Sequence, residues 1–241
     1  MIKKIFKREK FPDYSQHEIE DHEDLSDVNT YMEFDTFVGI DYSITSPAMT
    51  FYTREKGEFS FSNCQSWFFN SYKTRSFQNK VTNVFEIPYP PPEEVSVQKY
   101  EHIAEDLIEI IETRFNPERT LVGIEGYSYG SKGKVFHLAE NCGILKYLLY
   151  KHGFQIVHED LMAPSRIKKF ATGKGNANKV LMYESFLEEK GADILEQLQP
   201  EKKVDKSFVS DIVDSYYMCK YIEDLDKNEQ IILNIPYKTK T

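Results

Sequence analysis

Phe37-Val38-Gly39-Ile40-Asp41 decides the fold, because it reads as a buried strand that ends in an acid. Leu121-Val122-Gly123-Ile124-Glu125 repeats the same pattern. Runs of apolar and β-branched residues bounded by turn formers are typical of strands in a sheet covered on both faces. An acid that ends such a strand is expected at the rim of the sheet rather than in its core.

The patterns around these two stretches predict an α/β architecture. We expect strands at 36–41, 48–52, 58–61, at the run ending in residue 125, and at 154–158, and helices at 93–115, 135–152, 164–170, 177–190 and across Asp211 and Asp214 to about 223. Residues 63–80 are aromatic and are expected to be irregular, and the proline-rich 87–92 is expected to be a stiff connector. The order βββαβαβα indicates a mixed central sheet, three antiparallel strands followed by parallel ones, flanked by helices.

Composition and charge indicate one large domain with extensions. The chain has 241 residues and a formal charge of −9. We expect an acidic N-terminal extension at 1–35, one domain at 36–225 that carries the aromatic and proline-rich insert at about 63–92, and a C-terminal tail at 226–241. The three cysteines lack CxxC spacing, and no signal peptide or membrane span is apparent. These features favour a cytoplasmic protein, in the host cytoplasm if the source is viral.

A second pair of acids lies in an apolar, helix-patterned stretch. Asp211 and Asp214 are three residues apart, which puts both carboxylates on one helical face. Neighbouring anions persist where a cation or a shared proton compensates them. Together with Asp41 and Glu125 they make four carboxylates, and carboxylate oxygens are ligands that Mg²⁺ and Mn²⁺ prefer. The sequence therefore predicts a metal site.

A basic segment lies between the second and third acidic motifs. Between 127 and 179 the lysines and arginines far outnumber the acids: Lys132, Lys134, Lys146, Lys151, Arg166, Lys168, Lys169, Lys174 and Lys179. A solvated charge run is one explanation for such a segment. Its position between the acidic motifs favours a surface for a polyanion.

The order Gly-Ile-Asp, Gly-Ile-Glu and Asp-x-x-Asp resembles the RuvC-type Holliday junction resolvases of the RNase H-like superfamily, over about 37–221. A more specific likeness is the block Pro164 to Gly173 followed by Gly175 to Lys179, in which two lysines flank a glycine-containing turn. One departure is Tyr42-Ser43 after the first acid, where many relatives have Pro-Gly. The resemblance implies an RNase H-like fold, and a single nuclease domain without a motor favours a phage or viral member.

The resemblance also implies an activity and roles for named residues. It implies an endodeoxyribonuclease that resolves four-way or other branched DNA and leaves 5′-phosphate and 3′-hydroxyl ends. Asp41, Glu125, Asp211 and Asp214 would hold one or two Mg²⁺ ions, for which Mn²⁺ substitutes, with Asp41 as the bridging ligand. Lys168 and Lys179 would act on the scissile phosphate. The expected DNA contacts are Tyr127, Tyr129, Lys132, Lys134, Arg166, Lys169 and Lys174.

Symmetric cleavage of a four-way junction requires two active sites, so the resemblance implies a homodimer on branched DNA, without a membrane partner. Helix 135–152, with Leu138, Cys142, Leu145, Leu148 and Leu149, is a candidate interface, and burial of this stripe against its own sheet is the alternative.

Other functions remain open on the sequence alone. One is a different RNase H-like nuclease, such as a flap or general DNA or RNA endonuclease or the nuclease of a packaging machine, although no Walker motif is present. Another is an actin-like or sugar-kinase-like ATPase, because Gly39 to Ser43 also resembles the first phosphate loop of that fold. Its second Asp-x-Gly loop and its Gly-Gly adenosine motif are absent. A non-catalytic DNA-binding relative is a further alternative, but all four acids are present.

Overall fold

A six-stranded mixed sheet forms the centre of the structure. The structure, a computed structural model, describes residues 33–70, 80–90, 96–126, 135–190 and 193–233. The strand order is β4-β3-β2-β1-β5-β6. The strands are β1 (Thr36–Asp41), β2 (Ala48–Thr53), β3 (Cys64–Asn70), β4 (Val84–Pro88), β5 (Thr120–Ile124) and β6 (Gln155–Ile156).

β1 lies in the middle of the sheet and sets the position of the first acid. It pairs antiparallel with β2, where Asp41 is opposite Ala48, and parallel with β5, where Ile40 is opposite Ile124. Asp41 and Glu125 therefore leave adjacent strands at the same end of the sheet. β2 and β3 are also antiparallel, so the predicted mixed sheet of three antiparallel strands followed by parallel ones is confirmed.

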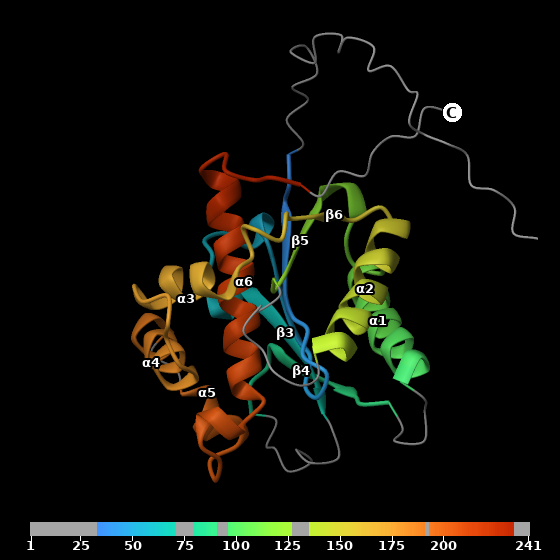
Figure 1. Cartoon of the computed structure of the whole chain (residues 1–241). Helices are drawn as coiled ribbons and strands as arrows, with labels where there is room; N and C mark the ends of the chain where they lie inside the picture. The colour runs from blue at the N-terminus through green and yellow to red at the C-terminus, as the bar shows by residue number, and fades with distance from the viewer. Residues whose placement is uncertain (1–32, 71–79, 91–95, 127–134, 191–192, 234–241) are drawn as a thin grey trace, which may run out of the picture. The chain divides into compact units, whose positions relative to one another are not determined.

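Helices cover both faces of the sheet (Figure 1). α1 (Ser96–Glu112) and α2 (Val135–Lys151) pack on the face to which Val38 and Ile40 point. α6 (Val209–Lys227) packs on the other face, with α3 (Pro164–Thr172), α4 (Lys179–Lys190) and α5 (Ile194–Leu198) beyond it. Successive strand residues point to opposite faces, which explains why the β1 residues 36–40 are all buried.

α6 lies directly against the backbone of β1. A Cβ added to Gly39 would be 2.3 Å from the backbone nitrogen of Cys219 and 2.4 Å from the carbonyl oxygen of Ser215, far inside van der Waals contact. Glycine is therefore required here for close approach rather than for a turn. The Ser215 and Thr50 hydroxyls are also hydrogen-bonded, 2.8 Å apart, between α6 and β2. These contacts fix the position of α6 over the sheet.

The strand predicted at 58–61 is wrong, and the irregular segment predicted at 63–80 is wrong at 64–70, whereas 71–79 lie outside the described residues. A short 3₁₀ helix occupies Phe61–Asn63, and the third strand is β3. The Asn83 side chain donates to the carbonyl oxygens of Phe61 and Cys64 and stabilises this entry into the strand. β3 reads as irregular in the sequence because it buries side chains on both faces and lacks a clean alternation of apolar and polar residues.

The connector predicted at 87–92 begins too early, and one helix was not predicted. β4 pairs in parallel with β3 and includes Ile87 and Pro88. Pro88 is tolerated because it is the last residue of an edge strand, where no ladder donor is needed. The stretch between the predicted helix at 177–190 and the one that carries Asp211 contains α5, whose first turn is capped by the Asp193 side chain accepting from the Glu196 backbone N–H. No helix among the described residues combines the length and apolarity needed to cross a membrane.

Candidate metal centre

Three carboxylates converge where β1 ends. Asp41 is the last residue of β1, and Asp211 and Asp214 are in the first turns of α6. One oxygen from each of the three carboxylates lies within 4.8 Å of the others. Asp211 is buried, and Asp41 and Asp214 are half-buried. The sequence placed these acids on two separate elements, and the packing of α6 on β1 brings them together.

Glu125, the fourth predicted acid, lies next to this group but not within it. It follows β5 directly, and its backbone N–H donates to the carbonyl oxygen of Ile40 at 3.4 Å. Its negative charge helps to raise the pKa values of both Asp41 and Asp214, so its carboxylate is close enough to interact with theirs. The structure thus gathers all four predicted acids at one end of the sheet.

The surroundings of these carboxylates disfavour their charged form. Desolvation raises the pKa of Asp41 well above its usual range, and the neighbouring carboxylates raise it further. Desolvation also raises the pKa of Asp214 to about 7, with Glu125 contributing. The pKa of Glu125 is raised by desolvation too, against the opposing charges of Lys168 and Lys179. Clustered carboxylates of this kind favour bound protons or a bound cation.

Lys179 and Lys168 bring positive charge to the carboxylates. Lys179, at the start of α4, donates from Nζ to Asp211 Oδ1 at 2.9 Å and to Ser210 Oγ at 2.8 Å. Burial alone would lower the pKa of Lys179, but the carboxylates, Asp211 foremost, raise it above its usual value. Lys168 on α3 is half-buried, and its charge lowers the pKa values of Glu125 and Asp214.

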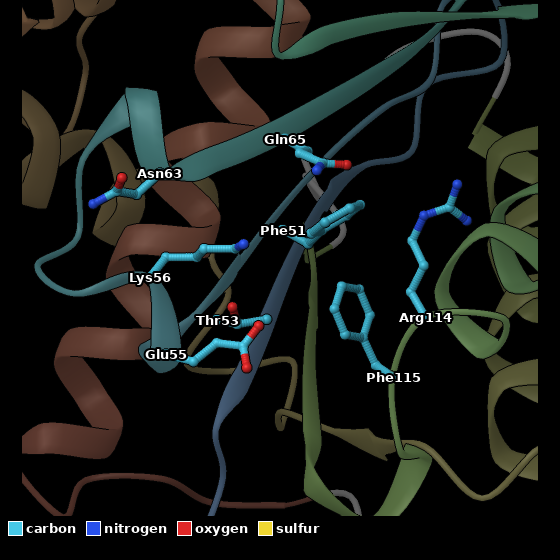
Figure 2. Close-up of a pocket in the computed structure, with 8 residues that line it drawn as sticks. All are labelled: Phe51, Thr53, Glu55, Lys56, Asn63, Gln65, Arg114 and Phe115. Carbon is cyan, nitrogen blue, oxygen red and sulfur yellow. The ribbon is translucent and has the colours of Figure 1, made fainter.

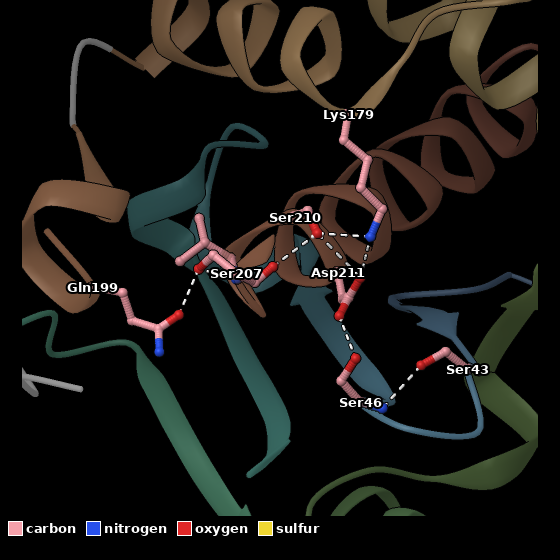
Figure 3. A network of polar contacts seen from close by, with 8 residues as sticks. Ser43, Ser46, Lys179, Gln199, Ser207, Ser210 and Asp211 are labelled. Atoms are coloured by element: carbon pink, nitrogen blue, oxygen red, sulfur yellow. Dashed lines mark hydrogen bonds and ion pairs between the residues drawn. The ribbon is translucent and has the colours of Figure 1, made fainter. Parts of the chain in front are cut away.

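Ser46 is a site residue that the sequence did not reveal. Its Oγ donates to Asp211 Oδ2 at 2.6 Å, on the side of the carboxylate away from Lys179 (Figure 3). The Ser46 backbone N–H in turn donates to Ser43 Oγ at 3.0 Å, which closes the turn after β1. Because Ser46 and Asp211 are 165 residues apart in the chain, no local spacing could have indicated the contact.

The start of α6 is also held by polar contacts (Figure 3). Ser207 Oγ donates to Gln199 Oε1 at 2.6 Å and accepts from the backbone N–H of Val209 at 3.2 Å. Ser210 Oγ donates to the carbonyl oxygen of Ser207 at 2.9 Å. These bonds satisfy groups of the first helical turn, which an α-helix cannot pair internally. They also fix the helical turn that carries Asp211.

Three of the seven predicted DNA contacts lie within the described residues. Arg166 and Lys169 are exposed on α3, and Lys174 is exposed in the turn that follows it. α3 therefore presents its basic residues to solvent while Lys168 approaches the carboxylates. The other four, Tyr127, Tyr129, Lys132 and Lys134, lie outside the described residues.

A separate cleft of about 260 Å³ lies at the other end of the sheet (Figure 2). Phe51 and Thr53 of β2 line it, and they pair with Val38 and Thr36 of β1, whereas Asp41 pairs with Ala48. The remaining lining residues include Arg114 and Phe115. The cleft is thus several strand residues away from the carboxylates.

The donor set fits a hard divalent cation. The three clustered residues offer only carboxylate oxygens, which suit Mg²⁺ and Mn²⁺ better than softer metals. The raised pKa values of Asp41 and Asp214 indicate that the folded chain does not fully compensate the charge of these two carboxylates. The residues present therefore fit a carboxylate-bound metal ion.

Comparison with known proteins identifies the fold. No family model and no curated protein matches the sequence. Among solved structures, Thermus thermophilus RuvC matches with a TM-score of 0.51 and 13% identity, over 82% of this chain and 99% of RuvC. The fold is that of RuvC. T. thermophilus RuvC in complex with Holliday junction substrate matches with a TM-score of 0.48 and 10% identity, over 83% of this chain and 99% of that one.

The yeast mitochondrial Holliday junction resolvase Ydc2 matches with a TM-score of 0.45 and 13% identity, over 82% of this chain and 83% of Ydc2. The RuvC match confirms the RNase H-like fold expected from the motifs. The aligned region includes 99% of the RuvC chain, so the two proteins share a whole fold and not a fragment.

Proposed function

We propose that this protein is a Mg²⁺-dependent, structure-selective endodeoxyribonuclease that resolves four-way or other branched DNA. The observation that carries the proposal is the convergence of the Asp41, Asp211 and Asp214 carboxylates at the end of the central strand of a RuvC fold. The branched substrate comes from the motif resemblance to RuvC-type resolvases, which also implies 5′-phosphate and 3′-hydroxyl products.

Asp41, Asp211, Asp214 and Glu125 would hold the metal. A bound Mg²⁺ supplies Lewis-acid stabilisation of phosphate charge and lowers the pKa of a bound water. Asp41 is the proposed bridging ligand because it lies on the central strand and interacts with the other three acids. Its position on a buried strand, with α6 packed on the backbone, gives the site the rigidity that positioning requires.

The basic residues would bind the DNA backbone. Lys179, whose side chain is 46% exposed, can reach both the carboxylates and an incoming phosphate. Arg166, Lys169 and Lys174 are exposed near Lys168 in sequence and supply affinity that falls with salt. The expected DNA contacts of Tyr127 and Tyr129 remain predictions from the sequence.

A homodimer would place two such sites on one junction. The stripe proposed from the sequence is mostly unsuitable as an interface, because Cys142, Leu145 and Leu149 are buried in the chain's own core. α2 instead exposes a different set of aromatic residues, Phe136, Tyr147 and Tyr150, with exposed fractions of 83%, 58% and 55%. Large exposed apolar side chains grouped on one helix are typical of an interface. We therefore propose this aromatic stripe of α2 as the dimer contact.

Cleavage of synthetic DNA structures tests the function. A four-way junction should be cut in Mg²⁺ and not in EDTA, and faster than a flap, a splayed duplex and a plain duplex of the same arm sequences. Equal cutting of all four would reject the resolvase reading and favour a general RNase H-like nuclease. No cutting of any DNA or RNA substrate in Mg²⁺ or Mn²⁺ would reject a nuclease altogether.

Asp41→Asn tests the metal site. We expect a loss of cleavage of about 100-fold or more, because the amide cannot replace an anionic bridging ligand, while junction binding in a gel-shift assay is retained. The matched control is Asp35→Asn, one residue before the opposite end of the same strand, where the carboxylate pairs with Arg119 on the surface. Asp35→Asn should cut at the normal rate. A normal rate for Asp41→Asn would rule out this site.

A further inference from the structure

Both oxygens of the Asp211 carboxylate accept from protein donors. Lys179 Nζ and Ser210 Oγ lie 2.9 and 3.2 Å from Oδ1, and Ser46 Oγ lies 2.6 Å from Oδ2. A carboxylate offers about four lone-pair positions. The one Ser210 hydroxyl proton goes to the Ser207 carbonyl oxygen, so Lys179 and Ser46 fill two of these positions, one on each oxygen. The side chain is only 8% exposed. Asp211 is therefore already paired with a cation before any metal binds.

Both donors are held in place independently of a metal. Ser46 is fixed by the bond from its backbone N–H to Ser43 Oγ at 3.0 Å. Ser210 is bonded to the carbonyl oxygen of Ser207 at 2.9 Å and itself accepts from Lys179. Lys179 thus has two partners on the same helical turn. A hydrogen-bonded ammonium–carboxylate pair in this setting is costly to break, because one charge would be left poorly solvated.

The charge of the site agrees with this pairing. Four carboxylates (Asp41, Glu125, Asp211 and Asp214) face the two ammonium groups of Lys168 and Lys179. When all six groups are ionised, four negative and two positive charges leave two negative charges uncompensated. One divalent ion compensates these two negative charges. A second ion would give the site without DNA an excess of positive charge.

We propose that Lys179 is the built-in second cation of this site, so that the chain without DNA binds one divalent ion, at Asp41, Asp214 and Glu125, rather than two. This inference rests on the proposed metal site and refines it. Asp211 then serves as the anchor of Lys179, and Ser46 is a positioning residue that holds the second oxygen of Asp211. A further ion would enter only with the additional negative charge of the DNA phosphate.

Manganese titration of the full chain tests the proposal without reference to cleavage. The free Mn²⁺ signal in electron paramagnetic resonance gives the number of ions bound, and only ions that Asp41→Asn releases are counted as site ions. We expect one per wild-type chain. Lys179→Met removes the ammonium and frees Asp211, so it should bind the first ion about tenfold more tightly and take up a second. Lys179→Arg keeps the charge and should stay at one ion.

Lys56→Met is the matched control, because Lys56 is exposed at the far end of β2 and its loss changes the net charge equally. It should bind Mn²⁺ as the wild type does. Two site ions per wild-type chain, or unchanged binding by a folded Lys179→Met, overturn the proposal while leaving the nuclease function intact. Absence of Mn²⁺ binding by the wild type overturns both. The wild-type count decides the matter even if Lys179→Met does not fold.

Discussion

Asp214 is a single residue whose ionisation should lower the stability of the metal-free protein. Its pKa is raised from 3.8 to about 7 in the folded chain, first by desolvation and then by Glu125. A carboxyl group with a raised folded pKa stabilises the protein below its unfolded pKa, and that contribution is lost as the pH rises through the folded value. The metal-free protein should therefore lose stability between about pH 4 and pH 7.

Asp214→Asn removes this penalty. In EDTA, we expect the variant to be more stable than the wild type. This advantage in unfolding free energy should grow by about 2 kcal/mol from pH 5 to pH 8. Urea unfolding at the two pH values measures the difference. Saturating Mg²⁺ at pH 8 should stabilise the wild type but not the variant. An advantage of Asp214→Asn that is the same at pH 5 and pH 8 would contradict the assignment of the shift to this carboxyl group.

The acids of the site were predictable, and their hydrogen-bond partners were not. Asp41 and Glu125 end apolar runs, and the spacing of Asp211 and Asp214 is a local helical signal. Lys179 required the likeness to a family block. Ser46 had no signal at all, because its contact with Asp211 depends on how α6 packs over the sheet. Local patterns report which side chains share an element, whereas contacts between distant elements emerge only from packing.

The junction of α6 with β1 is the element-level feature on which the site depends. Gly39→Ala would place a methyl group within 2.4 Å of α6 backbone atoms, which cannot rotate away as a side chain can. We expect a loss of about 3 kcal/mol in unfolding free energy. Because α6 must move to relieve the clash, Mn²⁺ affinity should fall as well, although Gly39 itself offers no ligand.

Gly143→Ala on α2 is the control for Gly39→Ala. A Cβ at Gly143 meets no atom within 4 Å, and the residue is exposed inside a helix. This variant should gain up to about 1 kcal/mol from helix propensity and keep its Mn²⁺ affinity. Urea unfolding and Mn²⁺ titration of both variants separate the two effects. Equal stability of the two would mean that α6 does not approach β1 as closely as the structure shows.

Element types were predictable where the sequence pattern was long or sharply bounded. The predicted helices at 93–115 and 135–152 correspond to α1 and α2, and Pro164 starts α3 as its first residue. The third strand was misplaced because β3 is flanked on both faces, so its polar and apolar residues do not alternate. β4 was missed because its pairing is parallel to β3 and ends in a proline. Both errors concern the edge half of the sheet, away from the acids.

The charge distribution of the whole molecule is compatible with DNA binding despite a net charge of −9. Basic residues are concentrated on and after α3, close to the carboxylates, whereas α1 carries an acidic surface that includes Glu101, Glu105 and Glu109. DNA would therefore approach from the α3 side, where the proposed metal ligands and the lysines proposed to bind phosphate lie. α2 packs on the opposite face of the sheet, which leaves its aromatic stripe available to a second copy of the chain.

Disruption of the α2 stripe should separate binding of a junction from its resolution. Phe136→Glu and Tyr147→Glu place charges on the proposed interface and should give a monomer of 28.3 kDa by light scattering, where the wild type has twice that mass. Val180→Glu is the control, because Val180 is exposed on α4, on the other face of the sheet. It should leave the mass unchanged.

A monomer carries one active site, so it should nick a cruciform plasmid where the dimer makes paired cuts and linearises it. The ratio of nicked to linear product, measured early in the reaction, reports this directly. Monomeric variants that still linearise the plasmid in single binding events would show that paired cutting does not depend on the α2 contact. A wild type that is already monomeric on DNA would contradict the proposed dimer itself.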